Sequence, residues 1–211
     1  MLNAVEVRVL GSLVEKEMAT PEYYPLTLNA LVNACNQKSN RDPAVAYDED
    51  TVADAIDSLR ERGLAAVITG AGMRVPKYRE LLSEKLNLGR RELAILCELM
   101  VRGPQTSGEL RDRAGRLHPF GDLEEVEAVL RRLIEWQPEP LAVRLPRQPG
   151  TKEPRSAHLL SGEPAIAAPA AAPATPARSD RLAELEAEVR ELREELRALR
   201  EQMEKFRAQF E

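Results

Sequence analysis

The sequence predicts a mainly α-helical chain with small β-hairpins, an α+β fold of two tandem winged-helix domains followed by a C-terminal coiled-coil helix. Three observations predict this class. The apolar pattern of residues 6–14 recurs at residues 92–100. Each copy precedes two further helical patterns and a hairpin pattern, and helix, helix, helix, hairpin is the winged-helix order. Beyond residue 180, apolar residues follow spacings that alternate three and four, which is the heptad pattern of a coiled coil.

Four parts are expected along the 211 residues. They are winged-helix domain 1 (1–88), winged-helix domain 2 (89–160), a linker rich in Pro and Ala (161–179) and the coiled-coil helix (180–211). A chain of this length holds two small domains and an extension. The linker has too many prolines to be helical and too little side-chain bulk to pack.

The first unit begins with a helix predicted over residues 3–18. Its Val7, Leu10 and Val14 share one face at helical spacing, so this helix should be mostly buried. Thr27 is placed to cap a second helix, whose apolar residues repeat every three to four positions. A polar loop follows this second helix.

A third helix is predicted to begin near residues 48–50, where acidic side chains suit the positive end of the helix dipole. Val52, Ile56 and Leu59 lie on its core face, and Gly63 ends it. These features complete the three helices of the first unit.

Each unit ends in a predicted hairpin. In the first unit, residues 64–69 and 73–78 are typical of two strands, and Gly70-Ala71-Gly72 is typical of the tight turn between them. In the second unit, residues 141–145 and 156–160 would form the strands around a Pro-rich tip. Both hairpins are interpreted as wings.

The second unit repeats the helices of the first. Its opening helix carries an apolar stripe of Leu93, Leu96, Cys97, Met100 and Val101. Gly103 follows that helix and ends it. Thr106 with Glu109, and Asp122 with Glu125, have the spacing of capping boxes at the start of the next two helices. The core positions of its third helix match those of the first unit: Val126, Leu130 and Leu133.

The heptads predict self-association. The seam consists of Leu182, Leu185, Val189, Leu192, Leu196, Leu199, Met203, Phe206 and Phe210. A parallel pair would bring Glu188 near Arg193 and Glu195 near Arg200, whereas an antiparallel pair would mostly set like charges together, so a parallel homodimer is favoured. A trimer, a single solvated helix, or a helix packed on its own domains are the alternatives.

Composition narrows the classes of function. Aromatic residues make up only 4% of the chain, which argues against a stacking surface for single-stranded nucleic acid, and a net charge of −5 argues against a general nucleic-acid coat. Cys35 and Cys97 are two lone cysteines within helical apolar patterns, which indicates buried reduced thiols. We expect a cytoplasmic protein, because the chain shows no signal-peptide core and no apolar run of membrane-spanning length.

Residues that could carry chemistry are few. His118 and His158 have no partners at metal-ligand spacing. Gly70-Ala71-Gly72 lacks the Lys and Ser or Thr of a phosphate-binding loop. Ser12 and Ser58 lie on predicted helices without the sharp turn that exposes a nucleophile. We therefore expect no enzyme, no cofactor, no metal site and no small-molecule substrate.

Basic residues cluster in the loop before the third helix and on both hairpins, and they are the candidates for nucleic-acid binding. They are Lys38, Arg41, Arg74, Lys77, Arg79, Arg144, Arg147, Lys152 and Arg155. Such side chains could neutralise duplex phosphates in a salt-dependent way. The alternative is that charged hairpin tips are only solvated.

The third helices argue against the standard docking of a recognition helix in the major groove. They carry Asp48, Glu49, Asp50, Asp54, Asp57 and Glu61 in the first unit, and Asp122, Glu124, Glu125 and Glu127 in the second. These acidic side chains would face phosphates. Binding led by the wings, or a protein partner, becomes more credible.

Residues 1–160 resemble the YceH-like family of bacterial proteins. The resemblance rests on RVLGSLVEKE at 8–17, TP at 20–21, YPLTLNAL at 24–31 and NACNQKSNRDP at 33–43. It is densest in the first unit and implies two winged-helix domains in a bacterial cytosol. The family has no assigned biochemical role, so the resemblance implies no substrate, ligand or catalytic residue.

Residues 36–41 form a loop rich in side-chain donors. These donors could bind a phosphate or an acidic group of a partner, or they could satisfy the backbone of an irregular connection.

Our leading hypothesis is a non-enzymatic tandem winged-helix protein that dimerises through its coiled coil and associates with duplex DNA through its wings in a regulatory role. The alternative is an acidic protein-interaction adaptor, similar to the winged-helix subunits of chromosome-condensing complexes.

Overall fold

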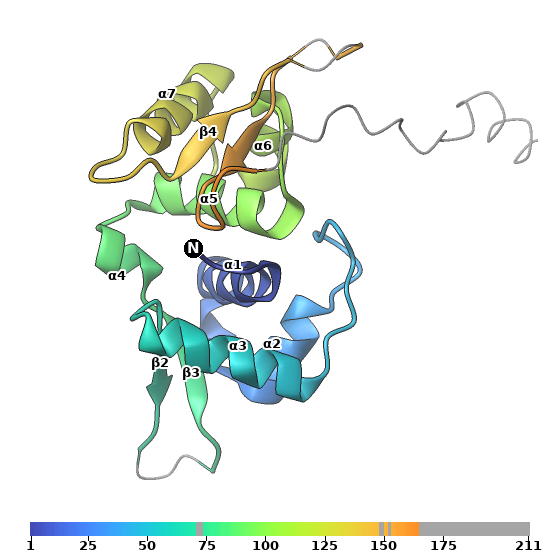
Figure 1. Cartoon of the computed structure of the whole chain (residues 1–211), viewed down its shortest axis with the longest axis vertical. Helices are drawn as coiled ribbons and strands as arrows, with labels where there is room; N and C mark the ends of the chain where they lie inside the picture. The colour runs from blue at the N-terminus through green and yellow to red at the C-terminus, as the bar shows by residue number, and fades with distance from the viewer. Residues whose placement is uncertain (71–73, 148–149, 152, 165–211) are drawn as a thin grey trace, which may run out of the picture. The chain divides into compact units, whose positions relative to one another are not determined.

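The computed structural model describes residues 1–70, 74–147, 150–151 and 153–164. These residues form α-helices and two small antiparallel sheets (Figure 1), so the predicted mainly α, α+β class is confirmed. The winged-helix assignment of the two halves stays a prediction. The linker from residue 165 onward and the heptad seam from Leu182 to Phe210 lie outside the described residues. No helix within the described ranges is long and apolar enough to cross a membrane.

The first half contains three helices, a three-stranded sheet and a short fourth helix. Its elements are α1 (Ala4–Ala19), a 3-10 turn (Pro21–Tyr23), β1 (Leu26–Thr27), α2 (Leu28–Cys35), α3 (Glu49–Glu61), β2 (Ala65–Ile68), β3 (Lys77–Glu80) and α4 (Leu82–Leu86). The sheet order is β1-β3-β2, with Tyr78 opposite both Leu26 and Val67. Asn3, Thr27 and Asp48 cap α1, α2 and α3 with their side chains.

The second half repeats this order with a smaller sheet. Its elements are α5 (Arg90–Arg102), α6 (Ser107–Ala114), α7 (Leu123–Ile134), β4 (Ala142–Arg144) and β5 (Ser156–His158). The capping box of Thr106 and Glu109 is confirmed. The second predicted box is only half formed: Asp122 accepts from the backbone of Glu125, but the Glu125 carboxylate accepts from Gly121 N at 2.9 Å.

The first hairpin differs from its prediction in the bounds of its second strand. Its second strand runs over Lys77–Glu80 and not from residue 73, because Pro76 has no N–H to donate to a ladder. The proposed turn residues 71–73 lie outside the described part of the chain. The short strand β1 and the helix α4 were not predicted.

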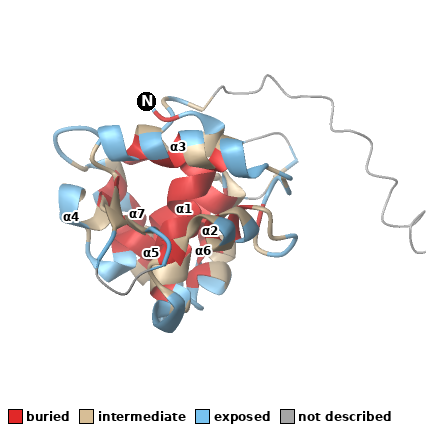
Figure 2. Ribbon diagram, turned by 90° about the horizontal axis from the view of Figure 1, so that it is seen from below, coloured by how far each residue is buried: buried red, intermediate tan, exposed pale blue. Residues whose placement is uncertain are grey.

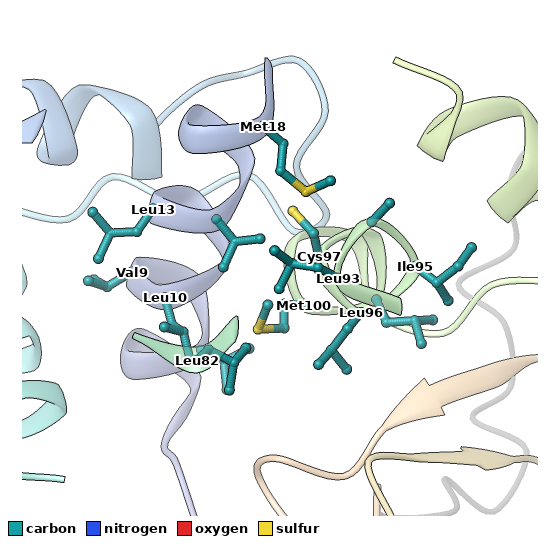
Figure 3. Packing of buried hydrophobic residues seen from close by; sticks show 14 of the residues in the cluster. Val9, Leu10, Leu13, Met18, Leu82, Leu93, Ile95, Leu96, Cys97 and Met100 are labelled. Atoms are coloured by element: carbon teal, nitrogen blue, oxygen red, sulfur yellow. The ribbon is translucent and has the colours of Figure 1, made fainter. Parts of the chain in front are cut away.

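The core lies where α1 packs against α5, and both halves contribute to one cluster of buried residues. In Figure 2 α1 is coloured as buried along most of its length, and Val9, Leu10, Leu13 and Val14 are fully buried. Figure 3 shows Cys97 and Met100 of α5 at this contact. The division into two domains stays a prediction, but the described halves share their core.

Gly11 lies at a close contact between the two helices. A Cβ atom on Gly11 would lie 2.9 Å from Val101 Cγ1 and 3.0 Å from Met100 Cβ. The thiol of Cys97 donates to the Gly11 carbonyl at 3.5 Å. Because residues 6–14 correspond to 92–100, Gly11 and Cys97 occupy equivalent positions, and the two repeats meet at equivalent residues.

The repeat extends to contacts between side chains. Glu6 and Glu92 occupy equivalent places near the starts of α1 and α5, and both are buried. Ser58 on α3 donates to Glu6 at 2.6 Å, and Arg132 on α7 pairs with Glu92 at 2.6 Å. The alignment that matches Val52 with Val126 also matches Ser58 with Arg132. Each opening helix is therefore tied to its third helix at the same place.

Candidate nucleic-acid interface

The two hairpins lie at opposite ends of the molecule (Figure 1). We call residues 65–80, which contain β2 and β3, wing 1. Residues 142–158, which contain β4 and β5, are wing 2. Because α1 and α5 lie between them, a straight ligand that lies along one wing does not reach the other.

Wing 1 carries three of the candidate residues. Arg74 is exposed and Lys77 is half-buried, and neither has an ion-pair partner among the described residues. Arg79 pairs with Glu84 at 2.6 Å, and this hydrogen bond raises the pKa of Arg79 above its usual value. Arg74 and Lys77 are thus the free cations of wing 1.

The arginines of wing 2 are mostly neutralised. Arg144 pairs with Glu127 of α7. Burial tends to raise the pKa of Glu127, but hydrogen bonds from Ser107 and Arg144 outweigh it and hold the pKa below its usual value. Arg155 pairs with Glu109 at 3.3 Å and donates to the Pro104 carbonyl at 2.7 Å.

Two further candidates belong to wing 2. Arg147 is exposed and donates from Nε to the carbonyl of Thr151 at 2.7 Å, with no carboxylate partner in the described ranges. Lys152 lies outside those ranges. Wing 2 therefore offers less free positive charge than its sequence indicates.

The two candidate residues in the loop before α3, Lys38 and Arg41, differ in exposure. Lys38 is exposed, whereas the side chain of Arg41 is fully buried. Arg41 donates to the carbonyls of Ala34 and Asn40 and pairs with Glu15 of α1. The predicted role of Arg41 in an interface stays a prediction, and in this structure its guanidinium group is enclosed and occupied by these contacts.

The donors of this loop mainly serve its own backbone. Asn36 Nδ2 donates to the Tyr47 carbonyl at 2.7 Å, and Asn36 Oδ1 accepts from Tyr47 N at 2.8 Å. Asn40 has a φ of 58°, a left-handed conformation that Asn tolerates, and its Oδ1 accepts from Arg102. These contacts favour the structural role for Asn36, Asn40 and Arg41.

The solvent face of α3 is acidic. Asp50, Asp54, Asp57 and Glu61 are all exposed and follow one another at spacings of four, three and four, which places them in one stripe. Arg60 pairs with Asp57 at 2.5 Å. This stripe would repel phosphates if α3 entered a major groove.

Sequence reasoning missed a group of buried charges between the halves. We call Glu15, Arg41, Glu98, Arg102 and Arg116 the seam cluster. Arg116 Nη2 lies 2.6 Å from Glu15 Oε1 and 2.7 Å from Glu98 Oε1, and it therefore joins the carboxylate of α1 to that of α5. Both carboxylates are at least 99% buried.

The electrostatics of the seam cluster favour the charged form of Glu15. Burial tends to raise the pKa of Glu15, but Arg41 and Arg116 outweigh it and lower that pKa below its usual value. Arg102 lies 3.2 Å from Glu98 on the same helix. A signal existed in the sequence, because Glu15 and Glu98 interrupt strongly apolar helices, but it does not name their partners.

Groups that could perform catalysis do not gather in the described ranges. No cluster of three or more His, Cys, Asp or Glu residues there could hold a metal ion. His158 is half-buried, and its partial removal from water lowers its pKa to about 4. Cys35 and Cys97 are buried free thiols, as predicted. An open hollow of about 310 Å³ beside wing 2 is lined by Thr106, Glu109, Thr151, Glu153 and Arg155.

The base of wing 1 holds two neighbouring carboxyl groups, Glu17 and Glu80, of which Glu17 has a raised pKa. Glu80 is buried at the end of β3, where its carboxylate accepts from Ser83 N at 3.0 Å. Burial and the neighbouring Glu80 raise the pKa of Glu17, in the last turn of α1, to about 7 from 4.5. Arg79 lowers this pKa and Glu84 raises it further. The folded state thus binds more protons than the unfolded chain between these two pH values.

Replacing Glu17 with Gln should remove much of this dependence. The contribution of Glu17 to the folding stability is lost as pH rises from about 4.5 to 7, because Glu17 must ionise in the folded state. At pH 8 we expect E17Q to be more stable than the wild type by about 1–2 kcal/mol, and the gain should vanish near pH 5. Urea denaturation at both pH values measures this, with E22Q, an exposed neighbour, as the control. Equal gains at both pH values would contradict it.

Comparisons with known proteins agree in one family. The model of a family described as "Protein of unknown function, DUF480" matches residues 2–151. A UPF0502 protein of Geobacter sulfurreducens is 58% identical over 196 residues, which cover 90% of this chain and 89% of the relative. One from Geotalea daltonii is 58% identical over 185 residues (88% and 84%), and one from Pelobacter propionicus is 63% identical over 163 residues (77% and 74%). These names state no activity, substrate or partner.

Proposed function

Because the chain belongs to DUF480, a family of proteins of unknown function, we propose a function from the arrangement of its own residues: a non-enzymatic winged-helix protein that associates with DNA through wing 1. The predicted membership of a bacterial family without an assigned role is confirmed. The observation that carries the proposal is wing 1 itself, which extends from one end of the molecule with Arg74 and Lys77 free of carboxylate partners in the described structure (Figure 1).

The proposed contact is led by the wing and not by α3. The acidic stripe of α3 precedes wing 1 in the chain, so deep insertion of α3 would bring carboxylates to phosphates. A two-stranded hairpin can instead place its cations on the backbone of a duplex. Such contacts supply affinity with little sequence preference, and they weaken as salt rises.

Binding of a fluorescent mixed-sequence duplex between about 50 and 200 mM salt tests this contact. We expect measurable affinity at low salt, and we expect R74A/K77A to reduce the slope of log K against log salt by about 2, since two phosphate contacts are lost. R144A/R155A removes the same charge from wing 2, where Glu127 and Glu109 already neutralise it, and should change the slope little. Absence of binding at the lowest salt would remove the DNA proposal.

A second candidate is an adaptor that binds a basic partner protein. The acidic stripe of α3 favours it, because four exposed carboxylates in line complement a row of Lys or Arg side chains. A protein partner would be lost in D54N/D57N and retained in R74A/K77A. The DNA contact should show the reverse pattern.

Self-association is the remaining part of the proposal. The heptad seam that begins at Leu182 favours a parallel homodimer, as argued from its charges. Residues 1–166 form a compact unit that contains the whole described core, so a chain truncated after Ser161 should fold. In sedimentation equilibrium we expect a monomer for this truncation and a dimer for the full chain. A truncated dimer would show that another surface assembles the protein.

A further inference from the structure

Two arginines of the seam cluster share one carboxylate. Glu98 Oε1 lies 2.7 Å from Arg116 Nη2, and Glu98 Oε2 lies 3.2 Å from Arg102 Nε. Glu98 is completely buried, whereas the side chains of Arg102 and Arg116 are 19% and 31% exposed. Their guanidinium groups are thus anchored on the inside and reach the surface on the outside.

Several donors of these arginines have no acceptor among the described residues. Arg116 uses only Nη2 in its contacts with described residues, which leaves Nε and Nη1. Arg102 uses Nη2 for Asn40 Oδ1 and Nε for Glu98, which leaves Nη1. A guanidinium has five N–H donors in a fixed fork that matches phosphate and carboxylate oxygens.

Positive charge is in surplus at this place. Three arginines of the cluster face two glutamates, and Arg8 is buried next to them with only the carbonyls of Cys35 and Pro43 as acceptors. Lys38 is exposed two residues before Asn40, which contacts Arg102. Asp42 is the one acidic residue between residues 36 and 47, and it opposes this surplus in part.

We infer that the outer edges of Arg102 and Arg116 form a binding site for a phosphate group, to which the exposed Lys38 of the same loop as Asn40 adds positive charge. The buried glutamates hold both guanidinium groups in place before a ligand arrives, so little side-chain entropy is lost on binding. Bidentate contacts from two such groups are the usual chemistry of phosphate recognition. The site lies between the halves, apart from wing 1, and does not rest on DNA binding by that wing. The phosphate could belong to a nucleic-acid backbone or to a small phosphorylated molecule.

The Nε–Hε signals of arginine in NMR spectra report directly on this site. Full-length protein is titrated with inorganic phosphate, and separately with a short duplex, at constant ionic strength. We expect the signals of Arg102 and Arg116 to shift with a dissociation constant on the order of 1 mM for phosphate. Shifts with both probes indicate backbone phosphates, and shifts with inorganic phosphate alone indicate a small ligand.

Surface variants test the site without disturbing its buried contacts. K38E should weaken phosphate binding about threefold to tenfold, and D42N should strengthen it about threefold. R131E, on the exposed face of α7, makes the same charge reversal as K38E and should have little effect. No shift of Arg102 and Arg116 with either probe overturns the proposal, and so does equal weakening by K38E and R131E. If R74A/K77A loses duplex binding while the signals of Arg102 and Arg116 still shift, the result bears on the DNA contact of wing 1 and not on the phosphate site.

Discussion

Replacing Arg116 with Met is expected to destabilise the folded protein by about 3 kcal/mol at neutral pH. Arg116 is the one residue of the seam cluster that contacts both buried glutamates. Without it, Glu15 and Glu98 remain buried while each keeps one arginine, Arg41 or Arg102. Met fills much of the same volume, so the loss comes mainly from the two ion pairs that Arg116 makes with the buried carboxylates and little from a cavity.

The pH dependence of R116M identifies this cause. In the wild type the pKa of Glu15 is lowered, so its contribution to stability is present above the unfolded pKa and is lost as pH falls. Removing Arg116 takes away one of the charges that lower the pKa of Glu15, so this carboxyl group is protonated more readily as pH falls. The difference between wild type and R116M should therefore be largest at pH 7 and should shrink toward pH 4.

Two controls accompany this measurement by urea denaturation. R111M removes an exposed ion pair with Asp112, whose partners are 46% and 70% exposed, and should cost less than about 0.5 kcal/mol. In R116M/E98Q one of the two buried carboxylates that lost the contact with Arg116 is neutral, so part of the lost stability should return. If R116M is no worse than R111M, the seam cluster does not hold the halves together.

Apart from the short helix α4, the helices of the described ranges could be predicted because their signals are local. Val7, Leu10 and Val14 repeat with the period of a helix, and Thr106 with Glu109 mark a helix start within four residues. The hairpins were predicted less well, because strand register depends on pairing partners. Strand β3 begins after Pro76 and extends to Glu80. Strand β1 has only two residues, which is too short for a periodic apolar pattern.

In the candidate site, too, local features could be predicted from the sequence, whereas features that depend on distant partners could not. Arg74 and Lys38 are at the surface, as a charged hairpin and loop predict. Arg41 is buried, because its loop packs on α1. Its partner there, Glu15, is 26 residues away in the sequence. The sequence shows the basic residues of wing 2 but not their carboxylate partners. Glu127 and Glu109 lie on α7 and α6, and only the folded structure brings them to Arg144 and Arg155. Composition gives the number of charges, and only tertiary structure gives their partners.

Replacing Gly11 with Leu is expected to cost about 3 kcal/mol, and replacing it with Ala about 1 kcal/mol. Gly in mid-helix is itself unfavourable by about 1 kcal/mol relative to Ala, so its presence in α1 needs a reason. That reason is the contact with α5, where a Cβ would lie 2.9 Å from Val101 and 3.0 Å from Met100. Ala forces a small shift of α5, whereas Leu cannot fit unless the helices separate.

Gly108 provides the matched control for this series. It also lies in a helix, α6, but a Cβ there would meet nothing closer than Thr106 Oγ1 at 4.0 Å. G108A should therefore be neutral or slightly stabilising, through helix propensity alone. Thermal and urea denaturation of G11A, G11L and G108A measure the series. Equivalent positions of the two repeats meet at Gly11. If G11A and G108A were equally stable, α1 and α5 would not cross closely at this point. The main evidence for a core shared by the two halves would then be lost.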